Sequence, residues 1–292
     1  MTIGPVQFLF NENINIYFQS IGNPFIDFLF LAITTLISEP GFMLLASLLF
    51  WCFDKKTGIR LVYVTLFCAF AAIFIKSLFG LPRPPEYLHK IYENGFGFPS
   101  GHALASSGFW GYLGGRVKNK RVIAAGAVAI IAVSLSRVYL GVHYAGDVVG
   151  GILIGLLIAF VLLKADSCLT DKFNRLDPRL KYAVAIILPG ILAVTSFFQK
   201  DLLKERIEIV VVMASVGVGY LLEEDRIRFK DARNNRQRLT RAFAGVIVLG
   251  GVYLFSSFAF PDFIFFNYAV LGLTSTFIVP MLFARIEAAP NI

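Results

Sequence analysis

The sequence has few charged residues for its length. Only 16% of its 292 residues are Asp, Glu, Lys or Arg, and 57% are hydrophobic, whereas soluble domains average about 25% charged and about 45–50% apolar residues. The three cysteines, Cys52, Cys68 and Cys168, lack the spacing of a metal site or a disulfide framework. The first residues lack the basic region of a cleavable signal peptide. These scarcities argue against a soluble domain and against a fold held together by zinc or disulfides.

The hydrophobic residues are gathered in long runs that are separated by short charged connectors, which is typical of a polytopic helical membrane protein. A spanning helix needs roughly 20 mostly apolar residues. Glu39-Pro40-Gly41 divides the first two runs, which are short and form either two spans or a re-entrant pair. We therefore predict an all-α transmembrane bundle with candidate spans at 24–38, 41–54, 59–79, 101–117, 121–139, 145–164, 181–198, 205–223, 240–260 and 264–285. Residues 1–23 mix Phe and Ile with Asn and Gln, which predicts an interfacial segment.

The net charge of +8 does not indicate a nucleic-acid partner, because most of the 27 lysines and arginines lie in alternate connectors between apolar runs. Such an excess marks the cytoplasmic side of a membrane protein. With ten spans, both termini are predicted to be cytoplasmic. The irregular stretch 80–99 then faces the extracytoplasmic side. It contains four prolines and three glycines, and a loop of that length in a compact bundle is usually functional.

Three polar clusters stand at the outward ends of predicted spans. The first runs from Lys76 to Pro84, the second from Pro99 to His102, and the third from Ser136 to Asp147. Ionisable residues at membrane depth are costly and by default mark a functional site. Any one of the cations taken alone is explained by a long side chain that reaches the interface. Their arrival on one side, beside two histidines and an aspartate, favours a shared function.

The residue types of these clusters suit a phosphoryl group. Lys76, Arg83 and Arg137 offer three cations for its equatorial oxygens, and arginine binds such oxygens in bidentate fashion. Ser100 and the backbone N–H groups of Gly101 and His102, at a predicted helix start, add donors where the helix dipole favours an anion. Ser100 is equally a plausible N-cap.

A nucleophile and a proton donor are also present. Asp147 lies four residues after His143, so on a helix both side chains share a face, and the carboxylate fixes one ring nitrogen while the other is free to attack. The alternative is an ordinary helix-surface pair. His102, from a different helix, is the candidate general acid. His89, in the irregular stretch, is expected to be a solvated loop residue, with a contact to a substrate headgroup as the alternative.

The pattern Lys-x6-Arg-Pro, Pro-Ser-Gly-His and Ser-Arg-x5-His-x3-Asp resembles the three-part signature of the type 2 phosphatidic acid phosphatase superfamily, over about 24–164. The resemblance implies a six-span phosphatase core at 24–164, with about four additional C-terminal helices in 165–292. It also implies a metal-independent lipid phosphatase that uses no cofactor and passes through a phosphohistidine. His143 is then the nucleophile, Asp147 orients it, and His102 protonates the leaving group. The phosphate ligands are Lys76, Arg83, Ser100, Gly101, His102 and Arg137.

The implied substrate is a lipid phosphate that reaches the site along the bilayer. Phosphatidic acid, phosphatidylglycerol phosphate, a polyprenyl (di)phosphate and a phosphosphingoid base all satisfy the signature. Two other classes of protein are alternatives to a lipid phosphatase. Soluble vanadium haloperoxidases resemble the same signature, but ten apolar spans disfavour them. A lipid-phosphate or anion transporter would require pore-lining polar residues in the C-terminal spans, and these spans contain few hydroxyls beyond Ser215 and the 274–276 run.

Overall fold

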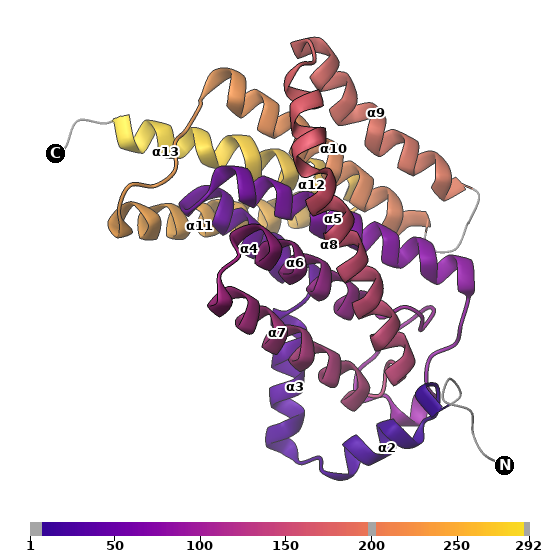
Figure 1. The fold of residues 1–292 in the computed structure, drawn as a ribbon. Coiled ribbons are helices and arrows are strands. Elements are labelled where there is room, and N and C mark those ends of the chain that lie inside the picture. The colour runs from indigo at the N-terminus through magenta and orange to yellow at the C-terminus, as the bar shows by residue number, and fades with distance from the viewer. Residues whose placement is uncertain (1–7, 198–202, 289–292) are drawn as a thin grey trace. The chain divides into compact units, whose positions relative to one another are not determined.

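The computed structural model describes residues 8–197 and 203–288, and within them all regular structure is helical (Figure 1). This confirms the predicted all-α class. The helices are α2 (Asn13–Ser20), α3 (Pro24–Leu36), α4 (Glu39–Cys52), α5 (Lys55–Phe79), η1 (Glu86–Leu88), α6 (Gly101–Val117), α7 (Lys120–Tyr139), α8 (Ala145–Asn174), α9 (Pro178–Phe197), α10 (Leu203–Arg226), α11 (Asn235–Ala259), α12 (Ile264–Leu273), the π-helical η2 (Thr274–Ile278) and α13 (Val279–Ala288).

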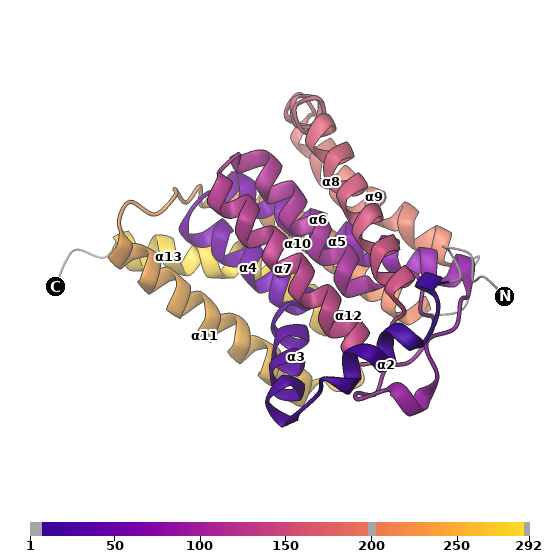
Figure 2. The same ribbon diagram turned by 60° about the horizontal axis from the view of Figure 1, so that its bottom comes forward.

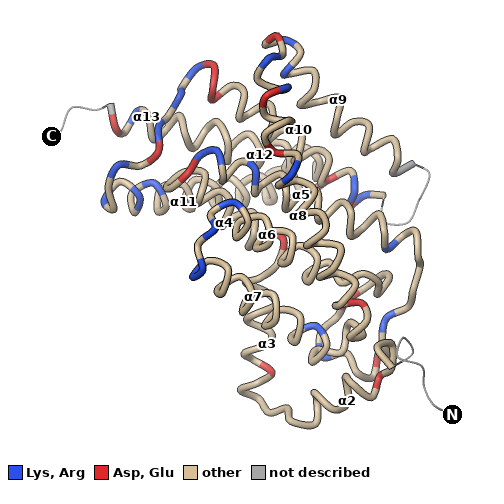
Figure 3. Tube along the Cα trace, viewed as in Figure 1, with Lys and Arg blue, Asp and Glu red and all other residues tan. Residues whose placement is uncertain are grey.

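Five of these helices, α5, α7, α8, α9 and α11, and the run formed by α12, η2 and α13 are long and apolar enough to cross a membrane. The bent pair of α3 and α4 adds a seventh candidate span. Helix α6, with 17 residues, and α10, which carries charged residues near both ends, fall outside this set, although both were predicted as spans. In Figure 3 the charged residues of α7 lie at its ends and not along its length. That distribution suits a helix whose middle is surrounded by hydrocarbon.

The pair α3 and α4 is bent by 55° at Ile37 and Ser38. Prediction had ended the first run at 38 and begun the second at 41, whereas α4 begins at Glu39. Pro40 is accommodated because proline is tolerated in the first turn of a helix, where its missing N–H has no intrahelical partner. A carboxylate therefore stands at a break between two apolar helices.

The chain divides into two compact units. The first comprises Met1–Met43 with Phe67–Asp166, and the second comprises Leu44–Leu66 with Ser167–Ile292. In the first unit α6 packs against α7, and α2 and α3 also contact α7. Helices α6 and α8 approach closely through small residues, since a Cβ on Gly155 would overlap the carbonyl oxygen of Leu104. Such backbone proximity is how membrane helices associate when both surroundings are apolar.

The second unit holds buried charges that the sequence had assigned only to membrane orientation. Lys55 pairs with Glu223, whose side chain is fully buried. The Arg241 guanidinium donates to both carboxylate oxygens of Glu287, at 2.8 and 3.0 Å, and to the carbonyl of Trp51. A buried ion is tolerated only when it is paired. We therefore infer that these ion pairs have a structural role and connect helices within the second unit.

Candidate active site

His143 lies in the short connection between α7 and α8, with 1% of its surface exposed. Its Nδ1 atom is 3.4 Å from Oδ2 of Asp147, and the same oxygen accepts the backbone N–H of Tyr144 at 2.9 Å. The two residues were predicted to share a helix face, but α8 begins only at Ala145. The pair therefore forms in another way: Asp147 sits in the first turn of α8, and its carboxylate turns back toward the residues that precede the helix.

Arg83 faces the other ring nitrogen. Its Nη1 atom lies 3.2 Å from Nε2 of His143 and donates to the carbonyl of Val142 at 2.8 Å. Its Nε and Nη2 atoms donate to the carbonyls of Asn94 and Gly95 at 2.9–3.2 Å. The loop and the connection that follows α7 are thus joined through one guanidinium, and the free nitrogen of the imidazole points at a cation.

Arg137, on the last turn of α7, is 1% exposed. Its Nη1 atom donates to the hydroxyl of Thr34 at 2.9 Å, and its Nη2 atom donates to Oε2 of Glu93 at 2.7 Å. The second oxygen of Glu93 lies 3.5 Å from Nη2 of Arg83. One carboxylate therefore bridges the two arginines that were predicted to bind phosphate, presenting two oxygens much as a phosphoryl group would.

Lys76 and Ser100 complete the donor set. The ammonium of Lys76, in the last turn of α5, donates to the carbonyl of Phe96 at 2.6 Å. Ser100 occupies the N-cap position of α6, but its side chain makes no capping bond. Its hydroxyl is buried without a partner among the described residues, while its N–H donates to the carbonyl of Asp147 at 2.9 Å. A buried hydroxyl of this kind is available to a ligand.

Gly101 and His102 form the first turn of α6. Glu39 lies against this turn, since a Cβ on Gly101 would be 3.4 Å from its Oε1 atom. Burial lowers the pKa of His102, and the charges of Glu39, Arg137 and Glu93 also act on it. The second histidine therefore belongs to the same charged cluster, and all eight predicted site residues lie in the first unit.

Burial and the neighbouring cations act together on the pKa of His143. Removal of the imidazole from water, reinforced by the charges of Lys76, Arg137 and Arg83, holds the pKa of His143 well below its usual range. For Glu93, burial raises the pKa but the charge and hydrogen bond of Arg137 outweigh it, so that the pKa is lowered. At neutral pH the site therefore combines an uncharged imidazole with an ionised carboxylate.

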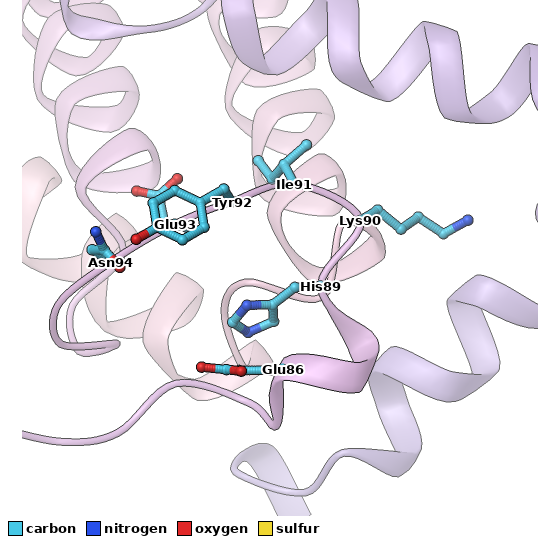
Figure 4. Close-up of a pocket in the computed structure, with 7 residues that line it drawn as sticks. All are labelled: Glu86, His89, Lys90, Ile91, Tyr92, Glu93 and Asn94. Carbon is cyan, nitrogen blue, oxygen red and sulfur yellow. The ribbon is translucent and has the colours of Figure 1, made fainter.

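A cavity of about 380 Å³ opens beside this cluster in the 86–94 loop. Figure 4 shows Glu86 and His89 near one another, Glu93 at the far side and Lys90 directed away from them. The Nε2 atom of His89 lies 2.9 Å from the carbonyl oxygen of Pro84. His89 is thus half-buried and bonded to its own loop, and not the freely solvated residue that the sequence favoured.

Sequence reasoning missed four residues that hold the predicted ones: Thr34, Glu39, Glu93 and, on α2, Asn15. The charge of Glu39 beside a proline was visible, but was interpreted only as a boundary between spans. Glu93 lies in the irregular stretch 80–99, where no spacing pattern relates it to the arginines. Nothing in the spacing of Thr34 or Asn15 relates them to α7, because their partners lie more than 100 residues away.

Comparisons with known proteins identify the family of this chain. Residues 57–168 match the PAP2 superfamily, and residues 207–291 match the PAP2 superfamily phosphatase, transmembrane extension. The undecaprenyl-diphosphatase of Sulfolobus acidocaldarius is 32% identical over 47% of this chain and 67% of its own. The chain belongs to the PAP2 superfamily, and it includes the transmembrane extension found in part of that family.

A curated relative and a solved structure from Bacillus subtilis are also similar to this chain. Phosphatidylglycerophosphatase B is 36% identical over 28% of this chain and 45% of its own length. A crystal structure titled as the first transmembrane PAP2-type phosphatidylglycerolphosphate phosphatase matches 53% of this chain and 84% of its own, with a TM-score of 0.47 and 24% identity. The matches to phosphatidylglycerophosphatase B and to lipid phosphate phosphatase delta of Arabidopsis thaliana span less than half the length of those two curated proteins.

Proposed function

We propose that this protein is an integral membrane lipid phosphatase that removes phosphate through a phosphohistidine at His143. The observation that carries the proposal is the placement of a buried, uncharged imidazole between Asp147 and Arg83, at 3.4 and 3.2 Å. The names of its relatives support the substrate class, since they act on phosphatidylglycerophosphate, undecaprenyl diphosphate and lipid phosphates. We propose that residues 24–164 form the catalytic core.

The reaction is proposed to proceed in two steps. Nε2 of His143 attacks phosphorus, the N–P bond forms, and the P–O bond to the lipid breaks while His102 protonates the leaving oxygen. Water then attacks phosphorus, His102 accepts its proton, and the N–P bond breaks to release phosphate. Asp147 holds Nδ1 throughout, and Lys76, Arg83, Ser100 and Arg137 surround the equatorial oxygens. Phosphoryl transfer asks a protein mainly for such positioning and charge stabilisation.

A transporter is the weaker alternative. Two hydroxyls of the C-terminal helices that would line a pore bond neighbouring groups instead: Ser275 lies 3.0 Å from the Ser47 hydroxyl, and Thr276 donates to the carbonyls of Gly272 and Val216. These bonds join helices of the second unit to one another. No observation in this unit favours ion passage over helix packing.

The proposed activity is tested by phosphate release from a panel of phosphorylated lipids by the purified protein in detergent. We expect turnover of at least one lipid monophosphate or diphosphate, and nearly the same rate in excess EDTA, because the proposed chemistry uses cationic side chains where other enzymes use a metal. The described residues contain no group of three or more potential metal ligands. A rate that EDTA abolishes and magnesium restores would contradict the metal-independent mechanism.

As the pH is lowered, kcat/KM is expected to fall only below pH 6.5, the usual pKa of histidine. We call this fall the acid limb of the pH profile. Because the pKa of His143 is lowered, the ring stays uncharged, and nucleophilic, as the pH falls through the range in which a free histidine gains a proton. Arg83→Met removes one of the cations that lower this pKa, so its acid limb should shift to higher pH, whatever the loss in absolute rate. The measurement is kcat/KM against pH for both proteins on one substrate, which cancels the substrate's own ionisation. An unshifted limb would contradict the assignment to His143.

The site is proposed to face the extracytoplasmic side, with both termini cytoplasmic. Cysteine labelling tests this with an internal control. Tyr92→Cys places a thiol in the loop at a residue that is 87% exposed, and the native Cys168 is exposed at the far end of α8. A membrane-impermeant maleimide should label Tyr92→Cys in intact cells, and Cys168 only after the membrane is opened. The reverse pattern would overturn the orientation.

A further inference from the structure

The connection that carries His143 follows the C-terminal end of α7. The last carbonyls of any α-helix have no intrahelical N–H partner. At the end of α7 the chain turns at Gly141, whose φ of +74° suits glycine, and a Cβ there would overlap the carbonyl oxygen of Leu88. The N–H of Gly141 reaches the carbonyl of Val138 at 3.1 Å. The N–H groups of Leu140 and Val142 reach the carbonyls of Ser136 and Arg137, at 2.8 and 3.3 Å. These backbone bonds all precede His143 along the chain.

Helix α2 supplies further donors to the backbone of this turn. Asn15 is completely buried, and its side-chain nitrogen donates to the carbonyls of Val138, at 2.8 Å, and His143, at 2.9 Å. The two hydrogens of one amide therefore join the beginning and the end of the turn. Figure 2 shows α2 lying across this end of α7.

Gln19 repeats the arrangement one helical turn further along α2. Its side-chain nitrogen donates to the carbonyl of Tyr139 at 2.9 Å and to that of Leu88, in the active-site loop, at 2.8 Å. Residues four apart on a helix face the same way, so both amides meet the turn together. The backbone N–H of Lys90 donates to the carbonyl of Leu140 at 3.0 Å and adds a third tie between loop and turn.

We propose that Asn15 and Gln19 are positioning residues for the nucleophile, so that α2 sets the place of His143 in the active site. The inference rests on the proposed function of His143. The imidazole has one neighbour on each side, Asp147 at 3.4 Å and Arg83 at 3.2 Å, and a ring displaced by about 1 Å would lose its alignment with both. A misplacement of that size can cost about 10²-fold in rate.

This role predicts which kinetic constant changes. Asn15 bonds the backbone of the turn and none of the proposed phosphate ligands. Loss of its donors should therefore slow the attack on phosphorus while leaving substrate binding nearly unchanged, which appears as a fall in kcat with little change in KM. A residue that only stabilises the fold would change neither constant for the folded enzyme.

The test compares Asn15→Leu with Asn267→Leu in the full-length protein in detergent. Asn267 is also buried and donates its amide to one backbone carbonyl, that of Phe260 at 2.9 Å, in the second unit. Both variants should lower the thermal unfolding temperature, because each leaves a buried carbonyl without its donor. Only Asn15→Leu should lower kcat, by about 10- to 100-fold, with KM within about twofold of wild type.

An unchanged kcat in Asn15→Leu would overturn the proposal, as would a fall in kcat/KM that comes wholly from KM. If Asn15→Leu does not fold, Gln19→Leu decides, because Gln19 is only partly buried; a kcat within about twofold of wild type would then overturn it. The proposed function fails separately, and visibly, if the wild-type protein releases no phosphate from any lipid of the panel.

Discussion

His143→Ala is expected to abolish phosphate release, by a factor of about 10⁴ or more, as when the nucleophile of other covalent enzymes is removed. The mutation deletes the atom that we propose forms the bond to phosphorus, together with the ring that lies 3.4 Å from Asp147. The fold should survive, because the ring itself makes few of the contacts in the turn: the bonds from Asn15, Gln19 and Arg83 go to backbone carbonyls.

His89→Ala is the matched control for that variant. It removes the imidazole of the adjacent cavity, which bonds the carbonyl of Pro84 in its own loop, and it should release phosphate at close to the wild-type rate. A labelled phosphoenzyme trapped from the wild-type protein, and absent from His143→Ala, would identify the intermediate. Turnover by His143→Ala at more than a few per cent of wild type would refute the phosphohistidine mechanism.

The residue types of the candidate site can be read from the sequence because they are local. Lys76, Arg83, Ser100 and Arg137 stand at the ends of apolar runs, and helix ends on one side of a bundle are brought together by the bilayer itself. The all-helical class follows from the same apolar runs. Neither prediction required knowledge of which helix packs against which.

What the sequence could not predict depends on irregular backbone and on long-range pairing. The helix start at Ala145, which puts His143 outside α8, is set by a turn and its bonds to α2, and not by the periodicity of the residues that follow. The bridge from Glu93 to two arginines requires the path of the 80–99 loop, which has no repeating pattern to read. The angle of the bend at 37–38 could not be predicted either, because proline and glycine mark a break between helices without giving its angle.

The second large effect is expected from Arg137→Lys. A lysine keeps the positive charge but has a single nitrogen in place of the guanidinium fork. In the protein that fork contacts Thr34 and Glu93 through different nitrogens, at 2.9 and 2.7 Å, so one ammonium cannot reproduce both contacts. We expect kcat/KM to fall by about 10²- to 10³-fold, the range for loss of one donor to a developing oxyanion.

Arg116→Lys makes the same substitution at another ion pair of the same unit, where Nη1 of Arg116 lies 2.8 Å from Oδ2 of Asp166. This control should keep kcat/KM near wild type, because the pair lies at the far end of α6 from the site. If Arg137→Lys matched the control, charge alone would suffice at position 137. Glu93 would then hold Arg137 for a structural reason, and not occupy the place that a phosphoryl group takes when substrate binds.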